Sequence, residues 1–388
     1  MTEANTELPV RPAELTLAFL QRVVTDAGVA PRQRVAAFSW KGLEVGVISE
    51  VVGLDVELVD DDATGTDGAS TQKSLIAKFL RPEFPFERMF EVESNFYNGF
   101  ASSDEQKAAF PFGLPKALFL SKQLIIMERV GGIDTFSCVE GCPESQILNV
   151  VTKLAQMHGR FWKADTSSLA PCAGIGSELA GDAKQQQFPG CWRAYLDDVP
   201  LDEVDRERVA RLCEKLSEDP ARLARIHDAV ANGPTTLIHG DFHTGNVLFA
   251  RHEQASEGSN DLSQLWLVDW ATCGKGNPLR DLAFLFIVGV RSEHRAAVEA
   301  ASLRTYAETI KQEGVDHLSL ADWTRHYKAC VLNQFVILVV YDHLSKHLAS
   351  NAKSEKLRQE LHAHFREVNA RACLAVLEHF DVAAIEQL

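Results

Sequence analysis

The stretch "LIHGDFHTGNVLF", residues 237–249, places four polar side chains between two apolar runs: His239, Asp241, His243 and Asn246. The apolar runs "LI" and "VLF" predict buried strands on both sides, so the polar residues are expected on a loop that joins two strands. Asp241 follows His239 by two positions, and Asn246 follows Asp241 by five. This H-x-D-x-x-x-x-N spacing is typical of one kind of catalytic loop.

The chemistry of phosphoryl transfer explains this spacing. An aspartate on such a loop can accept the proton of a substrate hydroxyl, and an asparagine five residues later can hold a metal ion on ATP. Farther along the chain, "LWLVDW" (265–270) places Asp269 at the end of an apolar strand. The sequence therefore predicts one hairpin that supplies a base, Asp241, and two magnesium ligands, Asn246 and Asp269.

A second pair of charged residues lies in the N-terminal half. The apolar strand predicted at "SLIAKFL" (74–80) contains a single charge, Lys78. The aromatic residues of "FPFERMFEVESNFYNGF" (84–100) recur at helical spacing, and Glu93 lies on their stripe, whereas Glu91 lies on the other face. An unpaired buried charge is costly. We therefore predict that Glu93, and not Glu91, pairs with Lys78.

The remaining patterns indicate an α+β chain with a strand-rich first part, residues 1–131, and a mainly helical second part, residues 132–388. The first part is expected to contain a helix at 11–28, two strands around Gly46 within 43–59, and a strand at 122–130. The second part is expected to be helical from about 144, with strands only around the catalytic loop and Asp269.

These motifs resemble the small-molecule kinases of the aminoglycoside phosphotransferase and choline kinase type, and most closely their ecdysteroid kinase-like branch. The resemblance covers about residues 12–370 and is carried by "PAELT", "ESNFY", "LAQMHGRFW", "HGDFHTGNVLF" and "LVDWATCGKGNPLRDLAFLF". It implies a bilobal protein-kinase-like fold, with magnesium and ATP between the lobes and the acceptor on the helical lobe. The implied reaction is transfer of the γ-phosphoryl group to a small-molecule hydroxyl.

The resemblance also implies a role for each matched residue. Asp241 would be the base, Asn246 and Asp269 the magnesium ligands, and Lys78, paired with Glu93, the contact to the α- and β-phosphates. The segment "IIMERV" would join the lobes, with backbone groups of two residues against adenine, Glu128 and Val130. The loop over the phosphates departs from the family pattern, because "VGVISEVVG" (45–53) has no G-x-G. Ser49 or backbone amides of that loop are therefore expected to contact the phosphates.

The net charge of the chain limits the kinds of molecule that it is expected to bind. Lys and Arg number 39 against 54 Asp and Glu, which gives a net charge of −15. Such a charge argues against nucleic acid and against an anionic membrane surface, both of which attract clustered basic residues. It favours a neutral or cationic small-molecule alcohol beside ATP. The polar, acidic N-terminus does not resemble a signal peptide, and the longest apolar stretch falls short of a membrane span of roughly 20 residues. We expect a cytoplasmic protein without a membrane segment.

Two alternatives stay open in the sequence. The same fold could serve as a pseudokinase, a binding or scaffolding protein, and the glycine-poor phosphate loop favours this mildly. A protein kinase is disfavoured, because Trp270 and Ala271 follow Asp269 in place of Phe-Gly and no A-P-E sequence follows. Several further polar residues are expected to be structural: His239 as a hydrogen-bonding residue of the loop, His158 in the core, Asp281 as an anchor of the loop backbone, and Cys138 and Cys142 as reduced cysteines. The sequence assigns no role to His243.

Overall fold

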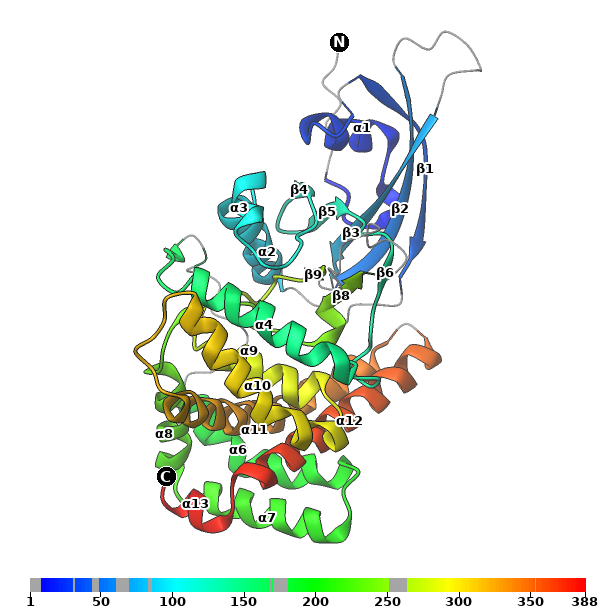
Figure 1. Ribbon diagram of the computed structural model, residues 1–388. Helices are drawn as coiled ribbons and strands as arrows, with labels where there is room; N and C mark the ends of the chain where they lie inside the picture. The colour runs from blue at the N-terminus through cyan, green and yellow to red at the C-terminus, as the bar shows by residue number, and fades with distance from the viewer. Residues whose placement is uncertain are drawn as a thin grey trace. The chain divides into compact units, whose positions relative to one another are not determined.

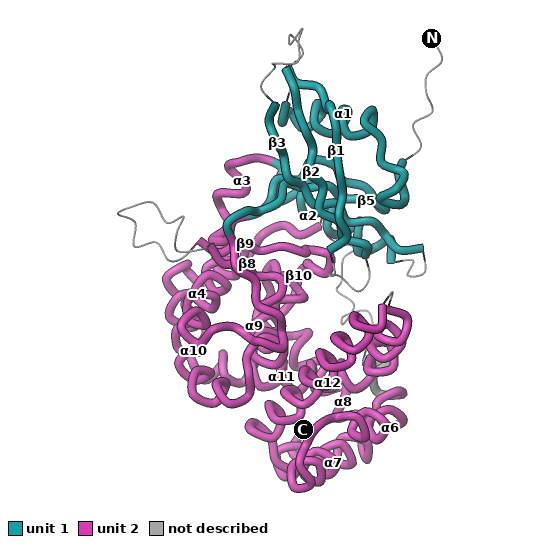
Figure 2. Tube along the Cα trace, turned by 90° about the vertical axis from the view of Figure 1, so that its right-hand side faces the viewer, with its two compact units in different colours: residues 1–102, 114–132 teal, residues 103–113, 133–388 magenta. Residues whose placement is uncertain are grey.

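A computed structural model describes residues 8–30, 32–43, 49–60, 70–82, 86–167, 169, 181–250, 264–352 and 354–388. The chain divides into two compact units. The first unit comprises residues 1–102 and 114–132, and the second comprises residues 103–113 and 133–388, as Figure 2 shows in two colours.

The first unit is built on a five-stranded antiparallel sheet with the strand order β1-β2-β3-β5-β4. Side chains alternate between the two faces of β2 and β3, and the apolar ones on one face pack against α1 to form the core of this unit. The strands are β1 (Gln33–Gly42), β2 (Ser49–Asp60), β3 (Ser70–Leu80), β4 (Ala117–Leu120) and β5 (Leu124–Glu128).

Two α-helices complete the described part of the first unit, α1 (Leu17–Asp26) and α2 (Glu87–Phe100). The predicted first helix starts later than expected. A short 3₁₀ turn, η1 (Pro12–Glu14), precedes it, and the Thr16 side chain caps α1 by accepting a hydrogen bond from the Phe19 amide at 3.1 Å. The sequence predicted neither β1 nor β4, and the residues around Gly46 lie outside the described part.

The second unit is mainly helical (Figure 1). Its α4 packs against α10, and its long α11 packs against α9 and α12. The helices are α3 (Asp104–Ala108), α4 (Glu144–Arg160), α6 (Gly181–Asp198), α7 (Glu203–Glu218), α8 (Pro220–Ala231), α9 (Leu279–Phe284), the π-helix η5 (Leu285–Gly289), α10 (Ser292–Gln312), α11 (Leu320–Ser350), α12 (Glu355–His379) and α13 (Val382–Glu386). Together with the sheet of the first unit, they confirm the predicted α+β class.

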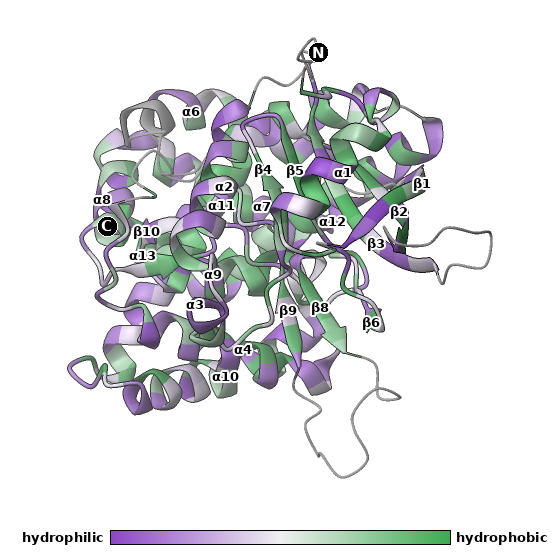
Figure 3. Ribbon diagram, turned by 90° about the horizontal axis from the view of Figure 1, so that it is seen from above, coloured by the Kyte–Doolittle hydropathy of each residue, from purple (hydrophilic) through white to green (hydrophobic). Residues whose placement is uncertain are grey.

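Two small antiparallel sheets interrupt the helices. One has the order β6-β8-β9, and the other pairs β10 with β7. The strand β8, coloured as hydrophobic in Figure 3, packs its apolar side chains into the unit. The bounds are β6 (Ile133–Asp134), β7 (Thr236–Ile238), β8 (Val247–Ala250), β9 (Leu265–Leu267) and β10 (Gly274–Gly276), with a 3₁₀ turn η3 (Thr244–Asn246) before β8.

The two units are not divided at one point of the chain, whereas the sequence predicted a single boundary after residue 131. Residues 103–113 belong to the second unit, where the Phe110 ring lies 4.5 Å from that of Phe161. The Gly113 amide donates to the Leu265 carbonyl at 2.8 Å. A Cβ atom at Gly113 would lie 2.5 Å from the Trp266 ring, so only glycine fits against this strand. Within the described ranges, no helix is both long and apolar enough to cross a membrane.

Candidate functional site

A buried carboxylate fixes the backbone at the start of the candidate catalytic loop, residues 239–246. Asp281, in the first turn of α9, accepts hydrogen bonds from the His239 amide at 2.7 Å and from the Gly240 amide at 2.8 Å. Burial would raise the pKa of this carboxyl, but hydrogen bonding from His158 and the loop amides lowers it. The structure thus confirms that Asp281 anchors the loop.

Gly240 explains the glycine between the histidine and the aspartate. Its φ of +84° lies in the left-handed region, and a Cβ atom there would lie 2.3 Å from the Thr272 carbonyl oxygen. Both the conformation and the close approach exclude a side chain. The loop can therefore turn sharply after His239 and present Asp241.

His239 joins the catalytic loop to the strand that leads to Asp269. Its Nε2 donates to the Val268 carbonyl at 3.0 Å, and its Nδ1 accepts from the Asp241 amide at 3.3 Å. Burial lowers the pKa of this imidazole. A neutral ring with one donor and one acceptor fits both contacts, so the structure places His239 in the structural role predicted for it.

Asn246 holds Asp241. Its Nδ2 donates to the Asp241 backbone carbonyl at 2.9 Å and to the Asp241 Oδ2 atom at 3.2 Å. Burial would raise the pKa of Asp241, but His243 and the Asn246 amide lower it to about 2. With a pKa of about 2, the carboxylate is in its charged form at neutral pH.

Asp269 adopts a strained backbone conformation beside Asn246. Its φ is 64°, and it is the only non-glycine residue in the described part of the chain with a positive φ. The amide of the preceding residue, Val268, donates to the Asn246 carbonyl at 3.1 Å, so the two predicted ligands lie on neighbouring positions of the β8–β9 hairpin. Such strain persists where the surrounding structure enforces it, and it clusters at functional sites.

The donor set of this hairpin fits magnesium. Magnesium prefers oxygen ligands, and it is usually held by one or two carboxylates together with substrate phosphates and water. Asn246 commits its amide nitrogen to Asp241, which leaves the Oδ1 atom for a metal, and Asp269 supplies a carboxylate. No group of three or more His, Cys, Asp or Glu side chains suited to a metal occurs among the described residues.

Within the first unit, Lys78 pairs with Glu93. The Lys78 Nζ atom of β3 lies 2.6 Å from the Glu93 Oε2 atom of α2, and the two side chains are 12% and 2% exposed. Glu91 is 35% exposed and lies 3.2 Å from Lys122 instead. The structure therefore contains the pair that the helical spacing predicted, while the contact of Lys78 with a nucleotide stays a prediction.

Three further residues assigned to ATP lie in the first unit. Ser49 is buried at the start of β2, opposite Leu80, and the phosphate-loop residues 44–48 before it lie outside the described part. Glu128 ends β5, and its amide donates to the Lys116 carbonyl at 2.9 Å, so this amide is already engaged. Val130 follows the strand, is half-buried, and makes no backbone hydrogen bond with the described residues. The contacts of these backbone groups with adenine stay predictions.

The sequence missed two residues beside Asp241. His243 Nδ1 lies 3.2 Å from the Cys138 Sγ atom, and the Nε2 atom of the same ring lies 3.5 Å from Asp241 Oδ2. Cys138 was expected to be purely structural, yet it supports the candidate base through one imidazole. The separation of 105 positions between Cys138 and His243 explains why no local pattern revealed the contact.

Arg371 of α12 holds the Cys138 segment in place. Its buried guanidinium donates to the carbonyls of Cys138 at 2.6 Å, Val139 at 2.9 Å and Val288 at 3.0 Å. The thiol contact thus rests on a fixed backbone rather than on a surface turn.

Comparison with known proteins finds relatives at the level of sequence and of structure. A relative from Psilocybe cyanescens, 4-hydroxytryptamine kinase, is 30% identical over 144 residues, which are 36% of this chain and 34% of the relative. The aligned part thus spans about a third of that protein. The ethanolamine kinase of Plasmodium vivax has 10% identity and a TM-score of 0.50, covering 96% of this chain and 92% of its own. A macrolide 2'-phosphotransferase from Brachybacterium faecium has 15% identity and a TM-score of 0.46, covering 90% and 97%.

The match to a family model is broader than the match to the curated relative. The model of the ecdysteroid kinase-like family matches residues 48–320, well over half of the 388 residues. This range includes Lys78, Glu93, Asp241, Asn246 and Asp269. The chain therefore belongs to the ecdysteroid kinase-like family.

Proposed function

We propose that the protein is an ATP- and Mg²⁺-dependent phosphotransferase that moves the γ-phosphoryl group to a hydroxyl of a small molecule. The observation that carries this proposal is the Asp241 carboxylate, held by Asn246 and His243 on a loop that Asp281 anchors. Asp241 acts as the base. It orients the acceptor hydroxyl and takes its proton late, because the transition state of phosphoryl transfer is loose.

Residues of the first unit serve the nucleotide. The Lys78 ammonium group contacts the α- and β-phosphates, and Glu93 holds the ammonium group in position. The backbone at Val130 meets adenine, while Ser49 or amides near it meet the phosphates. The support for these roles is the buried Lys78–Glu93 pair, which holds the only cation of the apolar segment 74–80 on strand β3.

Asn246 and Asp269 hold Mg²⁺ in this proposal. When bound there, the ion neutralises charge on the phosphate oxygens. The residues of the hairpin contribute the placement: Asn246 is turned by its bond to Asp241, and Asp269 by its strained backbone. The reaction then depends mainly on positioning and electrostatics.

The acceptor is a neutral or cationic alcohol. The net charge of −15 favours such a molecule over a second anion. The name of the curated relative, 4-hydroxytryptamine kinase, describes an amine that carries a hydroxyl group, and its kinship with this chain supports the same class.

Phosphate transfer from labelled ATP to a panel of alcohols tests the proposal. The panel contains amino alcohols, hydroxylated aromatic amines, sterols and aminoglycosides, each with and without magnesium. A magnesium-dependent product that disappears in Asp241→Asn is the expected result. The alternative is a pseudokinase that binds nucleotide without turnover. Nucleotide binding with no transfer to any acceptor, and no slow hydrolysis of ATP, would favour that alternative.

A further inference from the structure

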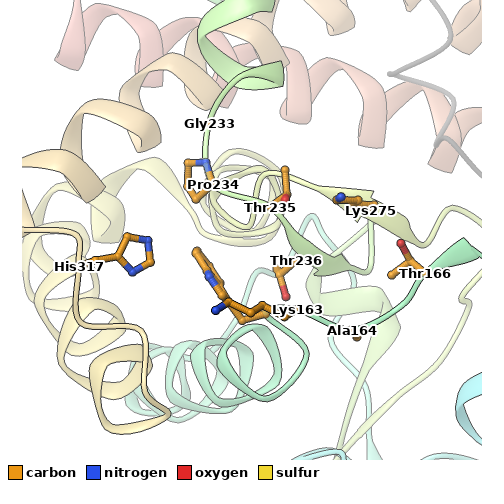
Figure 4. Close-up of a pocket in the computed structure, with 10 residues that line it drawn as sticks. Lys163, Ala164, Thr166, Gly233, Pro234, Thr235, Thr236, Lys275 and His317 are labelled. Atoms are coloured by element: carbon orange, nitrogen blue, oxygen red, sulfur yellow. The ribbon is translucent and has the colours of Figure 1, made fainter.

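The second unit contains a cavity of about 470 Å³ that none of the candidate catalytic residues lines (Figure 4). Its wall comes from four places in the chain: the segment after α4, the loop that enters β7, the strand β10, and the connection between α10 and α11. The loop side reaches Thr236, three positions before His239, so the cavity and the catalytic loop lie at opposite ends of the short strand β7.

The charge of the cavity differs from that of the protein. Lys163, Lys275 and His317 line it, and no described carboxylate does, although the chain has a net charge of −15. Neither lysine has a hydrogen-bonding or ion-pair partner among the described residues. Two acidic residues lie close in sequence. Asp165 accepts the Ser167 amide at 2.9 Å, and Asp316 precedes His317, but neither is part of the wall. No carboxylate of the described residues therefore offsets the positive charge of this wall.

The rest of the wall supplies hydroxyl donors and one large ring. Thr166 and Thr235 line the cavity, and in Figure 4 the amino end of Lys275 points toward Thr235. Trp162 forms an aromatic wall. Its ring is braced edge-on by His317 at 5.9 Å and by Trp323 at 6.0 Å between centroids. A braced ring keeps its orientation, which suits it to stack on a planar ligand.

We propose that this cavity binds a small phosphate monoester that carries a planar ring, at a site separate from phosphoryl transfer. A phosphate monoester has a charge of about −1.5 to −2 at neutral pH and accepts several hydrogen bonds. Two ammonium groups and two threonine hydroxyls match those needs, whereas a monocarboxylate would leave one ammonium group uncompensated. The planar part stacks on Trp162, and the volume admits one ring with its substituents.

Calorimetric titration of the full chain with phenyl phosphate tests this proposal. Three further probes each lack one feature of phenyl phosphate. Benzoate carries only one negative charge, inorganic phosphate has no ring, and benzyl alcohol has no charge. We expect phenyl phosphate to bind with a Kd below about 1 mM and more tightly than the other three. The double variant Lys163→Gln/Lys275→Gln removes both ammonium groups and should weaken the binding of phenyl phosphate by about tenfold.

Matched variants locate the binding. Lys153→Gln removes a lysine of α4 outside the cavity and should leave the affinity for phenyl phosphate unchanged. Trp162→Leu should reduce the affinity for phenyl phosphate to that for inorganic phosphate. Ala164→Phe fills the cavity without removing charge and should abolish binding. Unchanged affinity in the double lysine variant, or equal affinity for benzoate, overturns the proposal. If Lys78→Ala abolishes the binding of phenyl phosphate and the double variant Lys163→Gln/Lys275→Gln does not, the ligand binds at the nucleotide site instead. The ATP transfer assay, scored separately, decides the proposed function.

Discussion

The Cys138 Sγ atom lies 3.2 Å from His243 Nδ1. Burial would raise the pKa of this thiol, but the His243 charge and the hydrogen bond to it lower the pKa. Cys142, four residues away, has no such partner among the residues that the structure describes, and burial raises its pKa to about 12. The two thiols are 5% and 6% exposed, so access hardly differs between them.

Cys138 should therefore react with iodoacetamide faster than Cys142, because the thiolate is the reacting form. Mass spectrometry of the peptide that contains both residues, after brief alkylation at neutral pH, measures the ratio. In His243→Phe the preference for Cys138 should vanish. Equal labelling of both cysteines in the natural chain would contradict the prediction.

His243 should act on turnover through Asp241. Replacing it with Asn removes the ring between Cys138 and the base, so Asp241 loses one of its two side-chain supports. A charge-assisted contact contributes about 1.5–3 kcal/mol, and we expect kcat to fall by about tenfold or more while KM for ATP stays the same. A steady-state assay with both substrates varied separates the two constants. Cys138→Ser, which keeps a hydrogen-bonding group, should retain more activity than Cys138→Ala.

The Lys78–Glu93 pair predicts a third outcome. Lys78→Ala should weaken ATP affinity or turnover by at least about tenfold, roughly 1.4 kcal/mol, with the fold intact by circular dichroism. Glu93→Gln should reduce turnover as well, and it should lower stability by about 3 kcal/mol, because it leaves a buried cation without its carboxylate. Glu91→Gln is the matched control on the same helix and should do neither. A variant at Lys78 with undiminished turnover would remove this residue from the nucleotide site.

The local patterns predicted the elements that carry chemistry better than their surroundings. Glu93 was placed correctly because a helical stripe fixes the direction of a side chain without knowledge of its partner. The strand β1 was missed, because "QRVAAFSWKG" mixes charged, small and aromatic residues and is mostly exposed. Its place in the sheet depends on pairing with β2, from Gln33↔Asp60 to Gly42↔Val52, and such long-range pairing leaves no local pattern.

The site shows the same limit. The aspartate and asparagine of "HGDFHTGN" follow a spacing within one loop, and that spacing was sufficient to predict their proximity. The Cys138–His243 contact and the cavity beside Trp162 bring together residues from distant segments. Only the folded packing reveals them.

The buried Asp281 carboxylate should make the free energy of unfolding depend on pH. Its folded-state pKa is lowered, so the carboxylate contributes stability above its unfolded value of about 3.9, and this contribution is lost as the pH falls through the folded value. Asp281→Asn should lower the free energy of unfolding by about 3 kcal/mol at pH 7, because it weakens two charge-assisted bonds to the loop amides. The difference in free energy of unfolding between the natural protein and Asp281→Asn should become smaller below about pH 4. Urea midpoints at pH 7 and pH 3 measure this. Asp228→Asn, on the exposed face of α8, is the control, and a gap that is independent of pH would refute the assignment.

Asp241 and Asp269 should fail in different ways. Asp269→Asn removes the carboxylate of the magnesium site, so both magnesium-dependent nucleotide binding and transfer should be lost. Asp241→Asn keeps the shape of the side chain and removes only its charge. Nucleotide should then bind with near-normal affinity, while transfer falls by about 10²–10⁴, the usual contribution of a positioned base, or roughly 3–5 kcal/mol at about 1.4 kcal/mol per decade.

Calorimetry with ATP, with and without magnesium, alongside a transfer assay on the same samples separates these outcomes. Asp241 makes two hydrogen bonds within the loop: its amide donates to His239, and its Oδ2 atom accepts from Asn246. The unfolding midpoint of each variant therefore shows first whether the fold is retained. If Asp241→Asn abolishes binding of magnesium-ATP while Asp269→Asn preserves it, the two roles are reversed. If neither variant changes transfer, the loop is structural, and the strained φ of Asp269 serves the packing of the hairpin rather than a metal.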